Sequence, residues 1–364
     1  MNTENNKKKI CMIVQQRDVK GGIASVIEGY YGSSLESDYD VTYIEGYCDR
    51  NKVAKIKKFL LGVGQFCSLL KNNPPDLVHI HSSFGPSFTR KRFYINKAFK
   101  VGIPIVNHIH GADFDSFYTN ASKHKKRIIR ECYSKCSILV VLSDEWKTLI
   151  SDIVPSEKIR VIENYSVPQD TGLIREHFSK RFENKQVLFL GEIGQRKGAY
   201  DLPSIISRVR DVVPEAKFVI AGSGDIDGVK KGLRPQDMES VSFPGWLRGK
   251  AKEDVLLNSS VFLLPSYNEG LPMSILDAMG YGLPIVSTNV GGIPKLVLKN
   301  SRGISNGILS TPGELEKMSS DIVYYLTDPN AQHQAEIASL DIVNQFYSFD
   351  NHIRKLEEVY GELV

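Results

Sequence analysis

The sequence has few cysteines and no long apolar run. Its longest apolar stretches, such as residues 10–14 and 261–264, are strand-sized, whereas a membrane-spanning helix needs about 18 or more apolar residues. We therefore expect no membrane span. The odd, unevenly spaced set of cysteines does not suggest a disulfide framework, so we expect reduced thiols at Cys11, Cys48, Cys67, Cys132 and Cys136.

A secretory signal is also missing from the first residues. Three lysines precede only five apolar residues, and no small-residue cleavage site follows them. We therefore expect a cytoplasmic protein.

Neither sign of charge dominates the whole chain, but the two halves differ. Residues 1–180 hold 27 Lys and Arg against 19 Asp and Glu, a net charge of +8, whereas residues 181–364 hold 19 against 23, a net charge of −4. Much of the excess lies at residues 90–92 and 123–130. Because no zinc-finger, helix-turn-helix or aromatic RNA-binding pattern accompanies it, nucleic acid is the least favoured partner. An anionic membrane surface and a phosphorylated substrate remain.

Short apolar runs alternate with helix-period stretches along the whole chain of 364 residues. This pattern is typical of βα units and parallel sheets. It pauses at a polar stretch, residues 163–185, and then restarts. The expected strands are residues 10–15, 41–45, 77–81, 105–108, 138–142 and 160–162 before it, and 187–191, 218–221, 241–243, 261–264 and 285–287 after it.

We therefore predict an α/β protein of two doubly wound, Rossmann-like domains. The expected boundaries are 1–170 and 171–345, with a helix at 346–364 that packs back on the N-terminal domain. Such sheets bind ligands beyond the carboxyl ends of their strands. The active site is expected in the cleft between the two domains.

Residues 52–70 predict a helix with one apolar stripe and several lysines near its start. Two interpretations stay open. The stripe either packs on the sheet of the first domain, or docks on anionic lipid.

Two glycine-containing loops follow predicted strands. Gly21 and Gly22 follow the first strand, where they let the backbone approach a phosphate at a helix N-terminus or simply form a tight turn. Arg196 and Lys197 lie among glycines in the loop after residue 191. Adjacent cations at such a junction suit a pyrophosphate, and a solvated loop is the alternative.

Residues 262–297 are the most informative segment. Glu269 lies in the turn after a predicted buried strand, and Asp277 lies eight residues later on the next helix. The two carboxylates lie at different depths and could accept hydrogen bonds from hydroxyls on two linked parts of one ligand. The backbone amides of Gly270 and Leu271 could donate to a phosphate of the same ligand. A capping acid followed by an unrelated helical aspartate is the alternative for the spacing alone.

The stretch PSYNEGLP at residues 265–272, followed by Asp277, resembles the donor-binding motif of retaining GT-B glycosyltransferases of family 4. That motif is written E-x7-E within P-S-x-x-E-G-x-P. Further landmarks follow the family's order over most of the chain: Gly21-Gly22, His110-Gly111, Arg196-Lys197-Gly198, Ala221-Gly222-Ser223-Gly224-Asp225, Phe243-Pro244-Gly245-Trp246 and Val290-Gly291-Gly292-Ile293-Pro294.

The resemblance implies a role for each matching residue. Glu269 would touch the transferred sugar, Asp277 the ribose, and His110 the reacting sugar, with His110 and Glu269 as the catalytic pair. Asp113 would contact donor or acceptor, or merely cap a helix. The expected donor-binding set is Gly21, Gly22, Arg196, Lys197, Gly224, Trp246, Gly270, Leu271 and Asp277.

Two positions depart from the family's pattern. Asp277 stands where the family has a glutamate and is shorter by one methylene. Glu192 occupies a position where many members carry an arginine. Arg196 is the candidate to replace that cation.

The implied reaction moves a sugar from a nucleotide-diphosphate sugar, a UDP-sugar by expectation, to a saccharide or lipid-linked acceptor with retained anomeric configuration. The implied process is bacterial surface polysaccharide synthesis, of capsule or lipopolysaccharide type, on the inner face of the membrane. Fixed cations and helix N-termini would stabilise the leaving diphosphate. We expect no cofactor and no metal, although His79 and His81, and likewise His108 and His110, alternate along predicted strands.

Other functions share this two-domain architecture. A non-catalytic sugar-nucleotide-binding protein is motivated by Asp277. A sugar-nucleotide epimerase does not need the Glu269-Gly270-Leu271-Pro272 context, and a phosphorylase is normally longer and carries a pyridoxal phosphate lysine.

Overall fold

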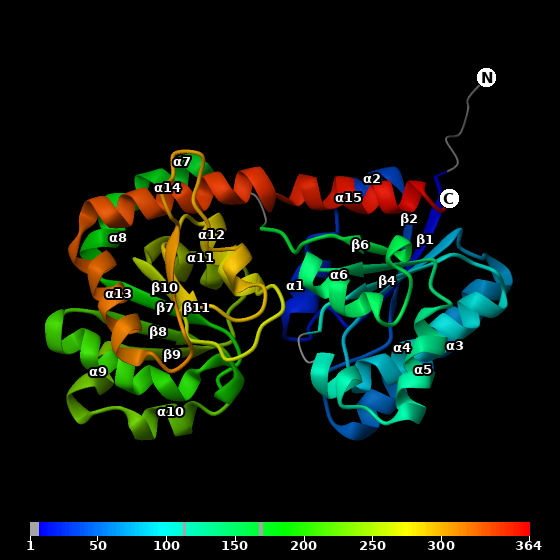
Figure 1. Ribbon diagram of the computed structural model, residues 1–364, viewed down its shortest axis with the longest axis horizontal. Helices are drawn as coiled ribbons and strands as arrows, with labels where there is room; N and C mark the ends of the chain where they lie inside the picture. The colour runs from blue at the N-terminus through cyan, green and yellow to red at the C-terminus, as the bar shows by residue number, and fades with distance from the viewer. Residues whose placement is uncertain (1–6, 112–113, 167–169) are drawn as a thin grey trace. The chain divides into compact units, whose positions relative to one another are not determined.

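Two parallel sheets organise the chain into two units (Figure 1). The computed structural model describes residues 7–111, 114–166 and 170–364. Unit 1 comprises Met1–Asn164 and Asp350–Val364, and unit 2 comprises Tyr165–Phe349. The predicted α/β architecture of two doubly wound domains is confirmed.

Unit 1 contains a six-stranded sheet in the order β2-β1-β3-β4-β5-β6. Its four inner strands, β1, β3, β4 and β5, are almost wholly buried, as expected where a parallel sheet is covered on both faces. The strand order reverses between β1 and β3, which makes that junction the switch point of the sheet. The strands are β1 (Lys9–Val14), β2 (Asp40–Glu45), β3 (Leu77–Ser82), β4 (Ile105–Ile109), β5 (Ile138–Val141) and β6 (Ile159–Val161).

Three helices of unit 1, α3, α5 and α6, begin after a residue whose side chain satisfies a free amide. Asn51, Ser122 and Ser143 each accept a hydrogen bond from a first-turn N–H. The helix at the far end of the sequence belongs to this unit. The helices are α1 (Gly22–Glu28), α2 (Ser34–Asp38), α3 (Lys52–Asn72), α4 (Pro86–Lys100), α5 (Lys123–Tyr133), α6 (Asp144–Ser151) and α15 (Phe349–Gly361).

Unit 2 contains a second parallel sheet in the order β12-β11-β10-β7-β8-β9. Its switch point lies between β7 and β10, so the loops that follow these two strands emerge side by side. The strands are β7 (Gln186–Leu190), β8 (Lys217–Ala221), β9 (Val241–Gly245), β10 (Val261–Leu264), β11 (Ile285–Thr288) and β12 (Gly307–Ser310). β12 was not among the expected strands. The other strands lie within two residues of their expected positions.

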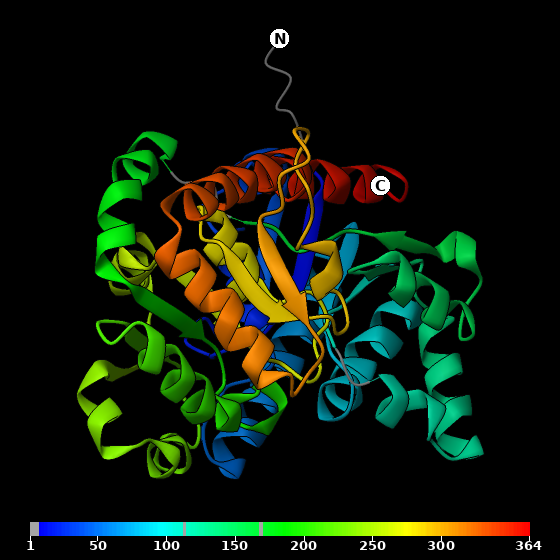
Figure 2. The same cartoon turned by 60° about the vertical axis from the view of Figure 1, so that its left-hand side comes forward.

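Helices cover both faces of this second sheet, and Figure 2 shows α13 lying along β10, β11 and β12. The helices are α7 (Thr171–Glu176), α8 (Phe178–Asn184), α9 (Leu202–Val212), α10 (Ile226–Gly232), α11 (Gly249–Asn258), α12 (Met273–Gly280), α13 (Leu315–Thr327) and α14 (Pro329–Phe346).

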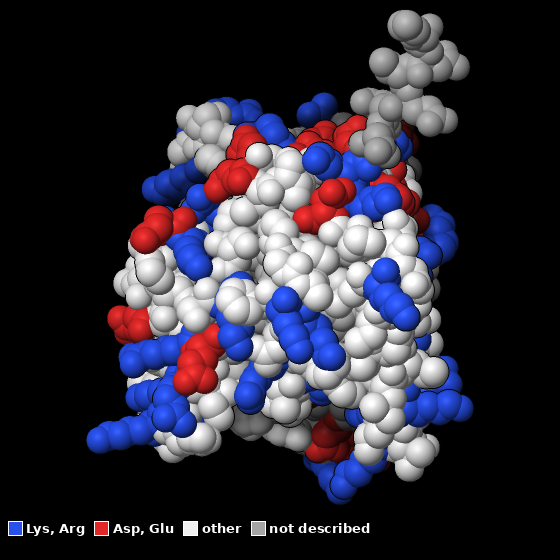
Figure 3. Space-filling model, turned by 90° about the vertical axis from the view of Figure 1, so that its right-hand side faces the viewer, with Lys and Arg blue, Asp and Glu red and all other residues white. Residues whose placement is uncertain are grey.

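Helix α3 divides its apolar residues between two environments. Phe66 is fully buried, and Phe59, Val63 and Leu70 pack against the core of unit 1. Exposed on the other side are Val53, Ile56, Leu60 and Leu61. The predicted single stripe is therefore only partly used for packing. Figure 3 shows this side of unit 1, where Lys and Arg gather over the part built from α3, α4 and α5.

Hydropathy sets one limit on the helices. Within the part of the chain that the structure describes, no helix combines the length and apolar character needed to cross a membrane.

Candidate active site

The loops that follow β7 and β10 interlock at the switch point of unit 2. The Tyr267 N–H donates to the Arg196 carbonyl oxygen at 2.8 Å, and Ser266 Oγ lies 3.0 Å from the same oxygen. Gly198 has φ +69°, and a Cβ there would lie 1.9 Å from the Pro265 carbonyl oxygen. Only glycine fits at that position. The backbone thus brings the predicted phosphate loop against the predicted sugar-binding loop.

This contact gathers three side chains around one carboxylate, that of Glu269, and two of the three, Arg196 and Lys197, were predicted site residues. Glu269 is only 6% exposed. Its Oε1 accepts a hydrogen bond from Ser266 Oγ at 2.6 Å and lies 2.6 Å from Lys197 Nζ and 3.6 Å from an Arg196 guanidinium nitrogen. Oε2 has no partner among the described residues. Burying a carboxylate is costly unless it is paired, and here the cations supply the pairing while one oxygen is left for a ligand.

Arg196 bridges several acceptors and remains 40% exposed. Its guanidinium donates to the Asn268 carbonyl at 3.1 Å and to Glu192 at 3.3 Å. Glu192, at the position where many family members carry an arginine, therefore pairs with Arg196. Lys197 is only 11% exposed and makes the closer contact to Glu269, so it is the better-fixed cation of this loop.

Asp277 lies on α12 and pairs with a residue that the sequence analysis did not single out. Its Oδ2 lies 2.5 Å from Lys252 Nζ on α11, and both side chains are about three-quarters buried or more. A lysine on an amphipathic helix, such as Lys252, usually has its charged group in solvent. Nothing in its spacing from Asp277 indicates the contact.

The remaining predicted donor residues of unit 2 lie in loops packed backbone to backbone. A Cβ at Gly224 would lie 2.2 Å from the Ile193 carbonyl oxygen. Gly270 accepts a hydrogen bond from the Gly292 N–H at 2.8 Å, and Leu271 is buried. Trp246 is partly buried, and its indole nitrogen has no hydrogen-bond partner among the described residues.

The predicted site residues of unit 1 lie near the carboxyl ends of its strands. Gly21, with φ +132°, immediately precedes α1, which begins at Gly22. His110 follows β4, and its Nε2 lies 3.0 Å from Nδ1 of His81. Asp113 lies outside the described residues.

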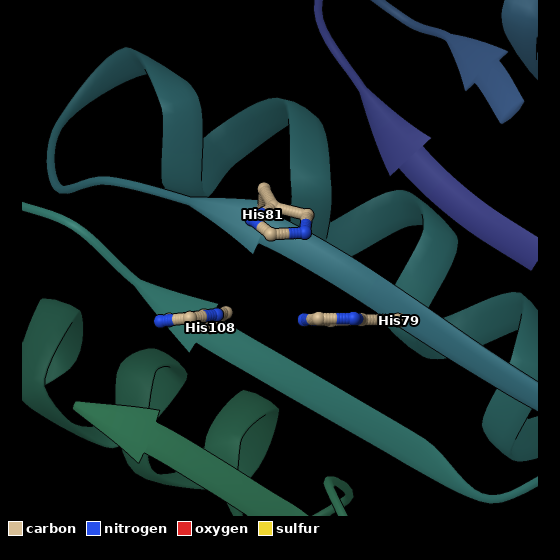
Figure 4. Close-up of side chains that lie close together, drawn as sticks. All are labelled: His79, His81 and His108. Carbon is tan, nitrogen blue, oxygen red and sulfur yellow. The ribbon is translucent and has the colours of Figure 1, made fainter. Parts of the chain in front are cut away.

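His110 is part of a cluster of five histidines. His79 and His81 project from one face of β3, His108 belongs to β4, His110 follows that strand, and His352 belongs to α15. Burial lowers the pKa of His79 and of His110 to about 3 and holds the pKa of His81 and His108 well below the usual value. These rings are therefore neutral at pH 7. Figure 4 shows three of them, His79, His81 and His108, around a common space.

Two family models match the chain, one on each half. Residues 32–165 match "Glycosyltransferase Family 4", and residues 184–328 match "Glycosyl transferases group 1". Together they include the loops after β7 and β10 and the histidine strands.

Similar proteins support the same assignment. The chain is 26% identical to the UDP-Gal:alpha-D-GlcNAc-diphosphoundecaprenol alpha-1,3-galactosyltransferase of Escherichia coli over 91% of this chain and 86% of that protein. It is also 26% identical to an uncharacterized 41.2 kDa protein in the cps region of Klebsiella pneumoniae, over 84% and 88%. The structure of Anabaena HepE in complex with UDP matches with a TM-score of 0.69 at 17% identity, over 98% of this chain and all of that one.

Proposed function

The chain belongs to the family 4-type glycosyltransferases of GT-B architecture, and from this premise we propose that it moves a hexose from a UDP-sugar to a saccharide or lipid-linked acceptor with retained anomeric configuration. It is a hexosyltransferase, and it acts in surface polysaccharide synthesis. The donor, the stereochemistry and the acceptor are the proposed parts.

The observation that carries the proposal is the pairing of Glu269 with Lys197. Oε1 is held by Ser266 and Lys197, whereas Oε2 is available for a sugar hydroxyl. The same lysine, with the exposed edge of Arg196, is close enough to attract a diphosphate. Sugar and leaving group are thus recognised by neighbouring atoms of two interlocked loops.

The chemistry follows from where charge develops. As the bond between the anomeric carbon and the diphosphate oxygen breaks, negative charge grows on the leaving phosphate and positive character grows on the sugar. Lys197 and Arg196 stabilise the former, and the Glu269 carboxylate stabilises the latter. The acceptor oxygen then bonds to the anomeric carbon, and its proton passes to the leaving phosphate. Asp277 is assigned to the ribose hydroxyls.

UDP as the donor nucleotide is supported by the names of similar proteins. The Escherichia coli relative uses UDP-Gal, and the Anabaena structure holds UDP. Thermal-shift screening against UDP-, GDP- and ADP-sugars tests this point, because a ligand that binds only the folded state raises the unfolding temperature. A shift with GDP- or ADP-sugars alone contradicts the UDP assignment.

Retention is tested on the product. Proton NMR of a reaction stopped at early times should show the anomeric coupling of the donor preserved in the new glycoside. An inverted product contradicts the proposed stereochemistry while leaving the glycosyltransferase assignment intact.

We also propose that transfer uses no metal at the diphosphate. Lys197 and Arg196 supply positive charge there, so turnover should survive brief treatment with EDTA. Loss of turnover that Mg²⁺ or Mn²⁺ restores contradicts this part of the proposal.

A lipid-linked acceptor requires approach to a membrane, and α3 offers a surface for it. Val53, Ile56 and Leu60 are each 60% exposed or more, and the lysines near the start of α3 adjoin them. Apolar residues beside lysines favour anionic lipid, by about 1 kcal/mol for each cation at the surface. We propose peripheral contact through this helix, on the cytoplasmic side of the membrane.

Vesicle flotation tests the membrane contact. Wild-type protein should float with anionic vesicles at low salt, and the double variant Ile56→Ser, Leu60→Ser should not. Val212→Ser, at a 64% exposed valine of unit 2, is the matched control. If the wild-type protein ignores the vesicles, the basic half instead serves a soluble or phosphorylated acceptor.

A further inference from the structure

Three histidines of unit 1 lie close together, and each has at least one ring nitrogen without a hydrogen-bond partner among the described residues. One ring nitrogen from each of His79, His81 and His108 lies within 4.8 Å of the others. These side chains are at most 2% exposed. We propose that they bind a transition-metal ion of the Zn²⁺ class, which fixes strands β3 and β4 within unit 1.

The ring positions fit such an ion. Imidazoles that share one zinc at about 2.0–2.1 Å have ring centres about 5 Å apart. The centroid separations here are 4.3 Å for His79 and His81, 5.3 Å for His81 and His108, and 5.7 Å for His79 and His108. In Figure 4 the rings of His79 and His108 lie edge to edge, and His81 lies over the gap between them. Small side-chain rotations complete the site.

Unsatisfied hydrogen-bonding capacity is the independent observation. Among the described residues, the Nε2 atoms of His79 and His81 and both ring nitrogens of His108 are buried without a partner. Leaving a buried polar atom unpaired costs about 1–3 kcal/mol. Four such atoms in one cluster are therefore expensive. From the sequence we expected no metal at these histidines; packing alone leaves that cost uncompensated, whereas a metal ion removes it for three of the four atoms.

The other nitrogens of two ligands are already held in place. His79 Nδ1 lies 2.6 Å from the Tyr360 hydroxyl, and His81 Nδ1 lies 3.0 Å from His110 Nε2. Metal-binding histidines usually have the second ring nitrogen hydrogen-bonded, which fixes the ring and its tautomer. Each of these rings thus directs Nε2 towards the common space. Because Tyr360 belongs to α15, the metal would also strengthen the attachment of this helix to unit 1.

The choice of metal follows from the ligands. Neutral imidazoles suit Zn²⁺, Cu²⁺, Ni²⁺ and Co²⁺, whereas Mg²⁺ and Ca²⁺ prefer oxygen. Three protein ligands leave a fourth position for a water molecule. The positive charge of Lys91, which lies near His81, would repel a divalent metal ion. Burial lowers the pKa of Lys91 to about 7, so the proton is lost at little cost.

Metal content is the first test. Protein purified through a histidine-free tag should carry about one equivalent of Zn²⁺ per chain by plasma mass spectrometry. After removal of the metal, Co²⁺ should give the intense visible absorption of a four-coordinate nitrogen site, and Zn²⁺ should raise the unfolding temperature where Mg²⁺ does not. A wild-type protein that neither carries nor takes up Zn²⁺ overturns the proposal and leaves water as the partner of these atoms.

Matched variants locate the site. His79→Gln and His108→Gln should each lower retained Zn²⁺ at least tenfold in the presence of a competing chelator. His124→Gln, on the same unit, and His333→Gln, on unit 2, remove exposed histidines and should retain it. Equal loss in all four variants, or none in any, overturns the proposal. If the cluster variants fail to fold, the cobalt spectrum and the Zn²⁺ shift of the wild-type protein still decide.

Discussion

The polar clusters of the two units have opposite properties. In unit 2, Glu269 is paired with Lys197 and Arg196, and part of the guanidinium remains in solvent. In unit 1, His79, His81 and His108 are neutral and buried, and four of their ring nitrogens have no partner in the described part of the chain. A charged, partly open site can exchange its internal partners for a ligand in every catalytic cycle. A closed, neutral site is suited to an ion that binds once and stays bound.

Glu269→Gln should have the largest effect and tests the open half of this comparison. Glutamine keeps the shape and accepts from Ser266, but loses the charge that faces Lys197 and the sugar. We expect turnover to fall at least about 100-fold, in the range seen for lost transition-state electrostatics, measured as initial rates at saturating donor.

Glu192→Gln is the matched control, because Glu192 also contacts Arg196 but is exposed. We expect less than about a threefold change, as for other exposed ion pairs. Similar losses in both variants would remove the special role of Glu269.

Lys197→Ala should come next in size. It removes the better-fixed cation, so UDP affinity should fall about 10- to 100-fold, in keeping with the energy of a charge-assisted hydrogen bond. Calorimetry with UDP measures it. Lys217→Ala, at the exposed start of β8, should leave affinity unchanged. Unchanged affinity in the Lys197 variant rules out the phosphate assignment.

Asp277→Asn should have a smaller effect, confined to nucleotide binding. Loss of one charged acceptor for ribose predicts UDP binding weaker by about tenfold, with turnover at saturating donor nearly kept. Lys252→Met tests whether the ion pair holds Asp277 in place, and should weaken UDP binding in the same direction. If Glu269→Gln and Asp277→Asn weaken free UDP equally, the two roles are misassigned.

The smallest functional effect is expected at Glu336, which lies in the core of unit 2. Burial raises the pKa of this carboxyl to about 8, although Arg181 lies 3.8 Å away. Since the folded state holds the proton more tightly than the unfolded chain does, the contribution of this carboxyl to stability is complete below about pH 4.5 and is lost as pH rises through 8. Glu336→Gln should flatten that fall without changing turnover.

Urea unfolding between pH 5 and 9 measures this dependence. The chain has two tryptophans, Trp146 in unit 1 and Trp246 in unit 2, so Trp146→Phe leaves fluorescence that reports on unit 2 alone. A wild-type midpoint that does not decline over this range contradicts the assignment of a protonated Glu336.

The fold was largely predictable because each strand is a short apolar run between helix-period segments. β12 escaped because it starts at Gly307, a poor strand residue. A Cβ there would lie 2.2 Å from the Ile285 carbonyl oxygen. Close packing against β11 thus requires glycine at this position, and glycine is a residue that strand propensity disfavours.

The candidate sites were predictable only within a single loop or strand. Glu269 and Lys197 could each be placed after a strand, but their contact depends on β7 and β10 being neighbours, which chain order does not reveal. Alternation puts His79 and His81 on one face, yet their approach to His108 needs the register in which His81 pairs with His108. Tyr360 comes from a helix 281 residues further along.

The position of α15 has a consequence for biosynthesis. Tyr30 contacts His352, and Glu163 contacts Lys355, so unit 1 is closed by residues that follow all of unit 2 in the sequence. During translation, residues 7–164 are made first, but unit 1 cannot be completed until residues 350–364 have also been made. Unit 2 is therefore the first to have its full complement of residues synthesised. The order of translation and the order of completion are reversed, and the nascent β1–β6 sheet has to remain soluble in the interval.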